Sequence, residues 1–122
     1  MPIFIKYANS QYEDRFLNPQ EMLWFSKDKR SLESSEITWM RYGHGGDDWT
    51  ATHFIPLFVM RKADAEKLKL YYYVGHVGSY SNLHETTRDK RGETVRLVEM
   101  NLRLTKPLSA ELYQHLTGDY DE

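Results

Sequence analysis

The chain has 122 residues, of which 40% are hydrophobic and 28% charged, and this composition fits one soluble globular domain with its own core. It has no cysteine, which excludes disulfide bonds, thiol catalysis and cysteine-ligated zinc. The formal net charge of −2 does not indicate a nucleic-acid-binding protein, so such a function has to depend on local basic patches.

No apolar run approaches the roughly 18 residues that a membrane-spanning helix needs, and residues 1–6 lack the features of a signal peptide. With the absence of cysteine, this predicts a cytoplasmic protein without a membrane partner. We expect one domain over residues 1–117 and a flexible acidic tail over residues 118–122. Because a strand begins at once and the last residues are polar and acidic, both ends are expected to be boundaries of a piece cut from, or once joined to, something larger.

The first half of the chain predicts one strand and two short helices. Residues 2–7 are rich in Ile and Phe, which is typical of a buried strand, and residues 8–15 are polar and irregular. Residues 18–21 (Asn-Pro-Gln-Glu) predict a helix start, with Asn as N-cap and Pro in the first position. Residues 34–41 predict a second helix, capped by its serine and buried through an Ile and a Met spaced i, i+3.

The middle of the chain predicts a loop and then strands. Residues 42–48 contain three glycines and predict a loop. Residues 53–60 are apolar on both faces, as in a covered strand, and Pro56 within them favours an edge position or a bulge. Residues 68–77 predict another long strand, reached through a hairpin connection at residues 63–67.

The last third predicts a loop, a strand and a helix. Residues 79–92 are polar and predict a long loop. Residues 95–104 alternate between apolar and polar, which predicts a half-buried strand, and Ser109 is a suitable cap for a helix over residues 110–116. The expected fold class is therefore β-rich α+β, with a small curled antiparallel sheet or barrel and short flanking helices.

The sequence gives no positive sign of an active site. No histidine pair has the spacing of a helical metal site, and no nucleophile or phosphate-loop motif is present. Asp47 and Asp48 follow His44 in the glycine-rich loop, where a cation or simply solvent is a suitable partner. We predict no catalytic residue, no metal and no cofactor.

Residues 24–31 (Trp-Phe-Ser-Lys-Asp-Lys-Arg-Ser) combine two aromatics, three cations and two serines. Cations and hydroxyls bind phosphate oxygens, and aromatic rings stack on exposed bases. Residues 88–106 form a second patch, with six cations against three acids. The alternatives are a core tryptophan beside solvated charges and a charged loop that maintains solubility.

Residues 12–15 (Tyr-Glu-Asp-Arg) form a third candidate binding segment. A carboxylate can accept a hydrogen bond from the amino group of cytosine, while a neighbouring aromatic ring stacks on the same base. The alternative is an Asp–Arg pair that anchors a loop.

These segments resemble a bacterial domain family of unknown function. The resemblance runs through residues 2–7, 12–19, 24–34, 72–75 and 98–113, and so covers nearly the whole chain. In that family the domain lies at the C-terminal end of proteins that carry a phospholipase-D-like nuclease and a superfamily-two helicase. These proteins resemble type IV restriction enzymes, which attack DNA that contains 5-methylcytosine or 5-hydroxymethylcytosine.

The resemblance implies an SRA- or PUA-like β-barrel that takes a flipped base into a pocket. The expected function is a non-catalytic reader of modified cytosine in double-stranded DNA, for modification-dependent restriction. Nuclease and helicase domains of the same or a partner chain would carry the catalysis. The residues expected to bind the base are Tyr12, Asp14, Trp24, Phe25, Ser26, Trp39, Trp49 and Tyr73. The residues expected to bind phosphates are Lys27, Lys29, Arg30, Arg88, Lys90 and Arg91.

Two other classes of function are open at this point. One is a protein-interaction barrel that docks a helicase or nuclease subunit without touching a base, and it predicts an exposed apolar patch. The other is a small nucleotide-directed enzyme acting through His76 or His84, which requires titratable groups that converge in one cleft.

Overall fold

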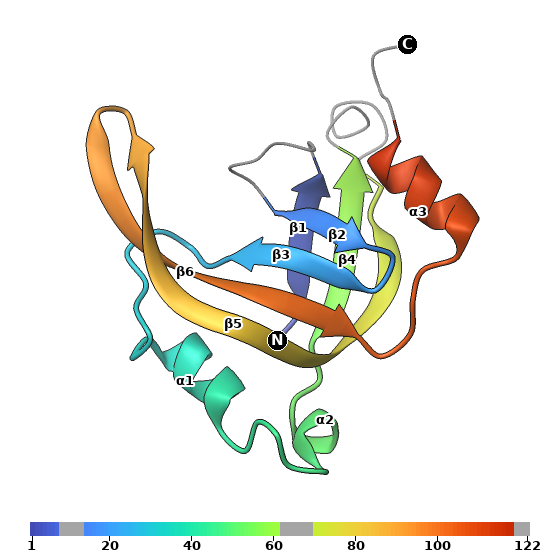
Figure 1. The fold of residues 1–122 in the computed structure, drawn as a ribbon, viewed down its shortest axis with the longest axis horizontal. Coiled ribbons are helices and arrows are strands. Elements are labelled where there is room, and N and C mark those ends of the chain that lie inside the picture. Colours follow the sequence, from blue (N-terminus) through green and yellow to red (C-terminus); the bar gives the residue numbers. More distant parts are fainter. Residues whose placement is uncertain (8–13, 62–69, 119–122) are drawn as a thin grey trace.

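The computed structural model of the protein describes residues 1–7, 14–61 and 70–118. Within these ranges, six strands form one curled sheet in the order β1-β4-β5-β6-β3-β2, and three short helices lie around it (Figure 1). The predicted fold class, β-rich α+β with a curled sheet and short flanking helices, is therefore confirmed. The strands are β1 Ile3–Tyr7, β2 Arg15–Asn18, β3 Glu21–Phe25, β4 Pro56–Arg61, β5 Tyr72–Lys90 and β6 Glu93–Leu104. The helices are α1 Ser35–Arg41, α2 Trp49–Thr52 and α3 Ala110–Thr117.

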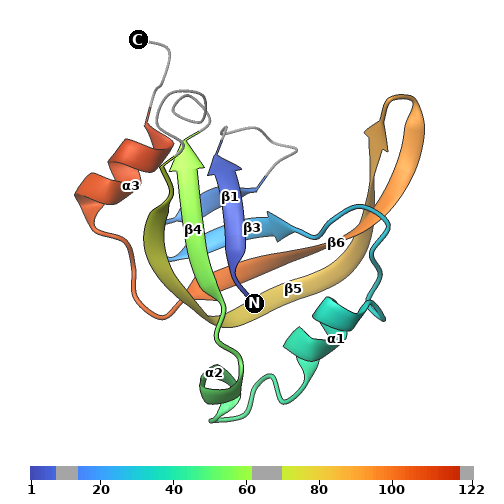
Figure 2. The same cartoon turned by 180° about the vertical axis from the view of Figure 1, so that it is seen from behind.

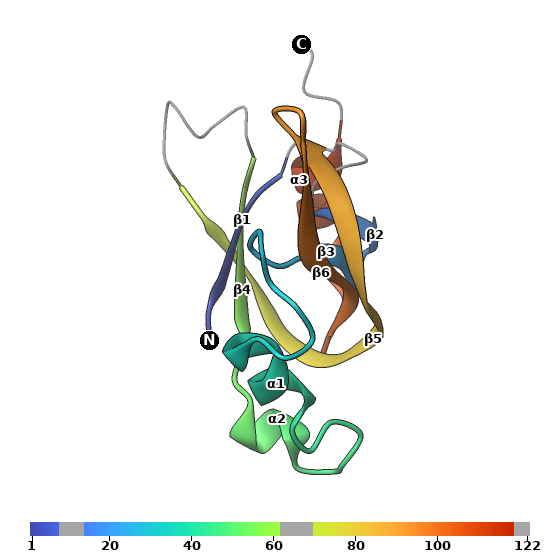
Figure 3. The same ribbon diagram turned by 90° about the vertical axis from the view of Figure 1, so that its left-hand side faces the viewer.

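The curl of the sheet depends on the long strand β5. Its first residues pair with β4 and the remainder pairs with β6, so one bent strand joins the two layers of the half-barrel (Figure 3). Gly75 has a φ of +112°, a conformation that favours glycine, and the β5–β6 register shifts between Val77 and Ser79. Because of this bend, the edge strand β1 faces the layer that contains β3 and β6.

The core lies inside the curl and is filled from both layers. Ile3, Ile5 and Tyr7 of β1 are buried, while the intervening Phe4 and Lys6 are exposed. The apolar residues predicted to share one face of the last strand are all buried: Val98, Met100, Leu102 and Leu104. This alternation fixes which face of each strand points inward.

The helices predicted at residues 34–41 and 110–116 are confirmed. Ser34 is the N-cap residue of α1, in which Ile37 and Met40 are buried as predicted. The predicted capping bond is wrong, because the Ser34 hydroxyl accepts from the N–H of Ser31 and not from the helix. Ser109 precedes α3, and its side chain accepts a hydrogen bond from the N–H of Leu112 at 3.1 Å. The single turn α2 was not anticipated. Within the described residues, no helix is both long and apolar enough to cross a membrane.

The helix predicted at residues 18–21 is wrong, because this segment is the tight turn between β2 and β3. The Asn18 side chain accepts from the N–H groups of Gln20 (2.8 Å) and Glu21 (2.9 Å). A side-chain bond of this kind closes a turn as readily as it caps a helix. Pairing of β3 with β6 then decides the outcome, since it buries Met22 and Leu23.

The loop predicted at residues 79–92 is also wrong, because β5 and β6 form a continuous hairpin that turns at Arg91 and Gly92. The hairpin extends beyond the rest of the sheet as an arm (Figures 1 and 2). An arm that is solvated on much of its surface needs few apolar residues, so its sequence lacks the usual strand pattern. Asp28 lies in the connection between β3 and α1. Its carboxylate binds Arg88 (2.6 Å) and Lys90 (2.7 Å) and so fixes the arm to that connection.

Strand β4 lies between β1 and β5, so Pro56 is not on an edge strand. The β4–β5 register shifts between Pro56 and Phe58, which confirms the predicted bulge. The hairpin connection predicted at residues 63–67 lies outside the described residues, as do residues 119–122 of the predicted tail.

Candidate functional site

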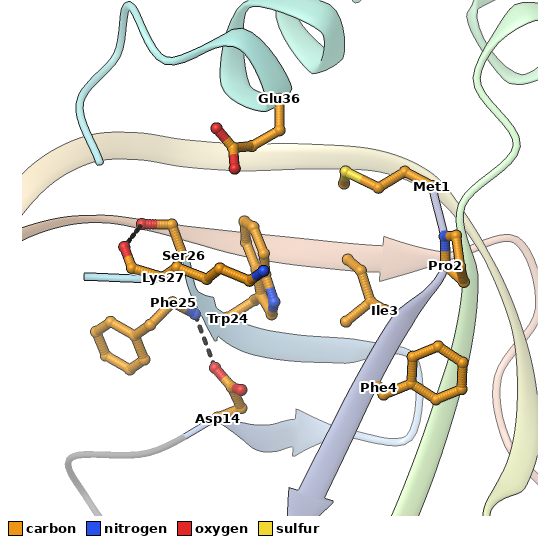
Figure 4. Close-up of a pocket in the computed structure, with 10 residues that line it drawn as sticks. All are labelled: Met1, Pro2, Ile3, Phe4, Asp14, Trp24, Phe25, Ser26, Lys27 and Glu36. Carbon is orange, nitrogen blue, oxygen red and sulfur yellow. Dashed lines mark hydrogen bonds between the residues drawn. The ribbon is translucent and has the colours of Figure 1, made fainter. Parts of the chain in front are cut away.

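A cavity of about 520 Å³ opens between the start of β1 and the end of β3 (Figure 4). It lies across the opening of the half-barrel, where no strand closes the gap between the two layers among the described residues. The residues that line it are Met1, Pro2, Ile3, Phe4, Asp14, Trp24, Phe25, Ser26, Lys27 and Glu36. A volume of this size lies within the range of small-molecule binding sites, about 300–1,000 Å³.

The aromatic and apolar lining comes from two strands. Trp24 and Phe25 end β3, and the half-buried Trp24 packs against the core while it also lines the cavity. Met1, Pro2 and Ile3 form the opposite apolar wall, and Phe4 lies beside them with 58% of its surface exposed. Two walls of this kind can hold a flat ring between them.

Asp14 lies just before β2, and hydrogen bonding to β3 fixes its carboxylate at the cavity. Its Oδ1 accepts from the backbone N–H of Phe25 at 2.8 Å (Figure 4). This bond orients the carboxylate beside the end of β3, where it lines the cavity.

Ser26 is buried and its hydroxyl serves the backbone. The Oγ accepts from the N–H of Val98 (2.9 Å) and donates to the carbonyl oxygen of Lys27 (2.9 Å), while its own N–H donates to Val98 O (2.8 Å). Because a hydroxyl has one proton to donate, Ser26 acts mainly by holding the cavity wall against β6.

Glu36 extends from α1 to the rim of the cavity. Its carboxylate accepts from Nε of Arg30 at 2.9 Å, and this hydrogen bond is the main reason that the pKa of Glu36 is lowered. The charge of Lys27 lowers the same pKa further. The cavity therefore combines two carboxylates, those of Asp14 and Glu36, with one ammonium group.

Three aromatics expected at the base do not line this cavity. Trp49 is 3% exposed and its Nε1 donates to the carbonyl of Met40 at 2.8 Å, so its ring belongs to the core. Trp39 packs on His53, with ring centroids 4.6 Å apart. Tyr73 lies on the outer face of the sheet and is 54% exposed. The fourth, Tyr12, lies outside the described residues.

The expected phosphate-binding cations divide into four groups. Lys27 lines the cavity, whereas Lys29 and Arg30 line a neighbouring cleft. Arg88 and Lys90 bind Asp28, and hydrogen bonds first from Lys90 and then from Arg88 lower the pKa of that carboxyl. Arg91 lies at the turn of the arm, with a φ of +54°.

The histidines of the enzymatic alternative do not converge. Nε2 of His84 lies 3.6 Å from a carboxylate oxygen of Glu99, and the His76 ring contacts Phe54 at a centroid distance of 5.6 Å. The described part of the chain contains no group of three or more His, Cys, Asp and Glu side chains that could hold a metal ion.

Sequence reasoning missed half of the lining. Glu36 and residues 1–4 line the cavity, but their sequence shows only a buried strand and an ordinary polar helix position. One signal was available, because the alternation of β1 places Phe4 opposite to the buried Ile3 and Ile5. That pattern marks Phe4 as outward-facing but does not say which element lies across from it.

The fold and the cavity define a small α+β domain whose curled sheet holds an aromatic- and carboxylate-lined cavity at its opening. Residues 1–116 match the family described as Domain of unknown function (DUF3427), so the chain belongs to that family. The expected resemblance to a domain family of unknown function is thereby confirmed. No curated protein matches the chain.

Proposed function

We propose that the protein is a non-catalytic reader of modified cytosine in double-stranded DNA, which takes the flipped base into the cavity beside Trp24. Its relationship to SRA- and PUA-like readers, and to restriction proteins with nuclease and helicase domains, is part of the proposal. The observation that carries it is that one cavity of suitable size gathers five residues expected to bind DNA: Asp14, Trp24, Phe25, Ser26 and Lys27.

Energetics permit this mode of recognition. Flipping a nucleotide out of the duplex costs a few kcal/mol, and stacking on aromatic side chains returns about 1–3 kcal/mol per base. Trp24 offers its ring from one wall. The Phe4 ring is stacked on Phe58, so the stacking in this proposal comes from Trp24. Lys27 at the cavity and phosphate contacts nearby supply the rest of the favourable binding free energy.

The polar groups suit the pairing edge of cytosine. That edge has one amino donor next to acceptors, and the cavity supplies carboxylate acceptors next to the Lys27 donor. Asp14, fixed by the Phe25 N–H, accepts from the amino group in this proposal. Thymine and uracil have a carbonyl in place of the amino group, so they would face the carboxylate unfavourably.

The apolar wall suits the 5-methyl group. Met1, Pro2 and Ile3 form this wall. One methyl group in an apolar pocket contributes only about 1–3 kcal/mol, so we expect discrimination against unmodified cytosine of about 5- to 150-fold rather than absolute selectivity.

The test is a binding titration with matched duplexes that contain 5-methylcytosine or cytosine at one position. Wild type should prefer the methylated duplex, and Trp24→Ala should weaken its binding by about 5- to 150-fold. Trp39→Ala is the control, because it removes a half-buried indole outside the cavity. Equal affinity of wild type for both duplexes would contradict the reader function.

One observation favours the protein-interaction alternative. Phe4, Phe58 and Tyr73 occupy paired positions on β1, β4 and β5, with successive ring centroids 5.0 and 5.5 Å apart, and both outer rings are more than half exposed. Such an aromatic row is typical of a surface that docks another domain, for example a nuclease or helicase subunit. In the titration, this function predicts no preference for methylated DNA and no effect of Trp24→Ala.

A further inference from the structure

A second cleft, of about 430 Å³, adjoins the β3–α1 connection on the side of β6. The residues that line it are Lys29, Arg30, Ser31, Glu93, Thr94, Val95 and Arg96. In contrast to the first cavity, it contains no aromatic side chain among its lining residues. Its chemistry is therefore that of a site for a charged polar group rather than for a base.

The cleft has a rigid floor. The backbone N–H of Lys29 donates to the carbonyl of Arg96 at 2.7 Å, which pins the connection to β6. Lys29 has a φ of +64°, a left-handed conformation that is uncommon for lysine and that persists only where its surroundings impose it. The N–H of Ser31 donates to Oγ of Ser34 at 2.9 Å, so the far end of the connection is also fixed.

Positive charge dominates the cleft. Three cations face one carboxylate, that of Glu93. Among the described residues, neither Lys29 nor Arg96 has a carboxylate partner, whereas Arg88 and Lys90 share Asp28.

The remaining donors and acceptors define what the cleft can bind. Arg30 bonds Glu36 through Nε, so its two terminal nitrogens still have donors to offer. Ser31 accepts a bond from the N–H of Glu33, which leaves its hydroxyl proton available as a donor. Thr94 donates its proton to Asp89. An anionic group with several acceptor oxygens, such as a phosphate, matches this set of donors.

The first cavity and the second cleft are lined by neighbouring segments of the chain, and an ion pair joins them. Residues 24–27 line the first and residues 29–31 line the second. Glu36, which lines the first, bonds Arg30, which lines the second. One short connection therefore separates a cavity suited to a base from a cleft suited to a phosphate.

We propose that this second cleft binds a backbone phosphate next to the flipped nucleotide, with Arg96 and Lys29 as its main contacts. The inference rests on the proposed function. It keeps Lys29 and Arg30 among the predicted phosphate-binding residues, adds Arg96, and takes that role from Arg88 and Lys90 of the arm. The connection between β3 and α1 then holds the nucleotide by its base on one side and by its phosphate on the other.

The first test measures the salt dependence of binding to a duplex with a single abasic site. This duplex keeps its phosphates but has no base at that position to enter the first cavity. Arg96→Gln should reduce the slope of log affinity against log salt by about 0.9, the loss of one phosphate contact. Lys106→Gln is the charge-matched control, because Lys106 is exposed and lines neither hollow. Glu93→Gln, which removes a carboxylate that lines the cleft, should tighten binding. An Arg96→Gln slope equal to that of wild type or of Lys106→Gln would overturn the inference.

The second test is independent of DNA. Titration with inorganic phosphate, followed by NMR of the backbone amides, should shift residues 29–31 and 94–96, and Arg96→Gln should abolish these shifts. Phosphate-dependent shifts without any preference for methylated DNA would support the phosphate site in the cleft and contradict the proposed recognition of modified cytosine. No shift at these residues would reject the cleft, whether or not the methyl preference is found.

Discussion

Two aromatic-rich regions of the molecule differ in what lies against their rings. Beside Trp24, the ring borders a cavity of about 520 Å³. Around Trp49, other rings fill the space: Trp49 stacks on His53 at 4.9 Å, and His44 stacks on Tyr80 at 3.6 Å. An abundance of aromatic residues therefore indicates a binding site only where no other side chain occupies the face of the ring.

Hydrogen bonds add to this difference. Both nitrogens of the buried His53 ring face backbone or hydroxyl oxygens, with Nε2 2.6 Å from Trp39 O and Nδ1 2.9 Å from Thr52 Oγ1. Trp49 donates its one N–H to Met40 O. The polar atoms of this cluster are used internally, whereas the cavity beside Trp24 presents Asp14, Glu36 and Lys27 at its lining.

The largest expected effect separates the two tryptophans by stability. Trp49→Ala should lower the free energy of unfolding by about 3–5 kcal/mol, because it removes a fully packed ring and its hydrogen bond. Trp24→Ala should cost clearly less, because one side of that ring already borders a hollow. Denaturant unfolding of both variants measures the difference, and equal losses would mean that the two rings are packed alike.

A smaller effect concerns the pH dependence of the packed cluster. Burial lowers the pKa of His44 below its usual 6.5, with a lesser contribution from the nearby His53. The unfolded chain therefore binds this proton at a higher pH than the folded chain does. The stabilising contribution is complete above about pH 6.5 and declines as the pH falls toward the lowered pKa of the folded state.

Protonation would also remove an acceptor, since Nε2 of His44 accepts from the backbone N–H of Tyr80 at 3.2 Å. We expect His44→Gln to flatten the fall in unfolding free energy between about pH 7.5 and 5.5. The comparison of slopes cancels the contributions of the other histidines. A variant slope as steep as that of wild type would show that His44 is not the group responsible.

The smallest expected effect lies on the arm. Because Asp28 already binds Arg88 and Lys90, Arg88→Gln should change DNA affinity by less than about twofold, well below the effect of Arg96→Gln. The measurement is the same titration at one salt concentration. A loss as large as that of Arg96→Gln would return the phosphate contact to the arm.

Part of the candidate site was predictable because its residues are consecutive. Trp24, Phe25, Ser26 and Lys27 follow one another and combine aromatic, hydroxyl and cationic side chains, and the structure brings that segment to a cavity. Trp39 and Trp49 were equally plausible by residue type, but their positions beside His53 are set by packing between α1, α2 and the sheet. No local pattern distinguishes a ring that lines a hollow from a ring that fills one.

The wrong predictions about the fold also arise because local sequence does not show which elements meet in space. Strand β1, the end of β6 and helices α1 and α3 follow from alternation and capping, which act between residues close in the chain. The turn at Asn18 and the arm beyond Ser79 depend on pairing with β6. A partner strand supplies the hydrogen bonds and burial that the local sequence lacks.

The sequence by itself determined a β-rich α+β fold, the inward face of its strands and a segment that gathers aromatic and cationic side chains. Tertiary structure alone decided that β1 lies across from β3, that α1 brings Glu36 to Arg30, and that the cations of the arm bind Asp28. The physical reason is that local patterns specify which side of an element is buried, whereas a cavity depends on which elements the bend of β5 brings face to face.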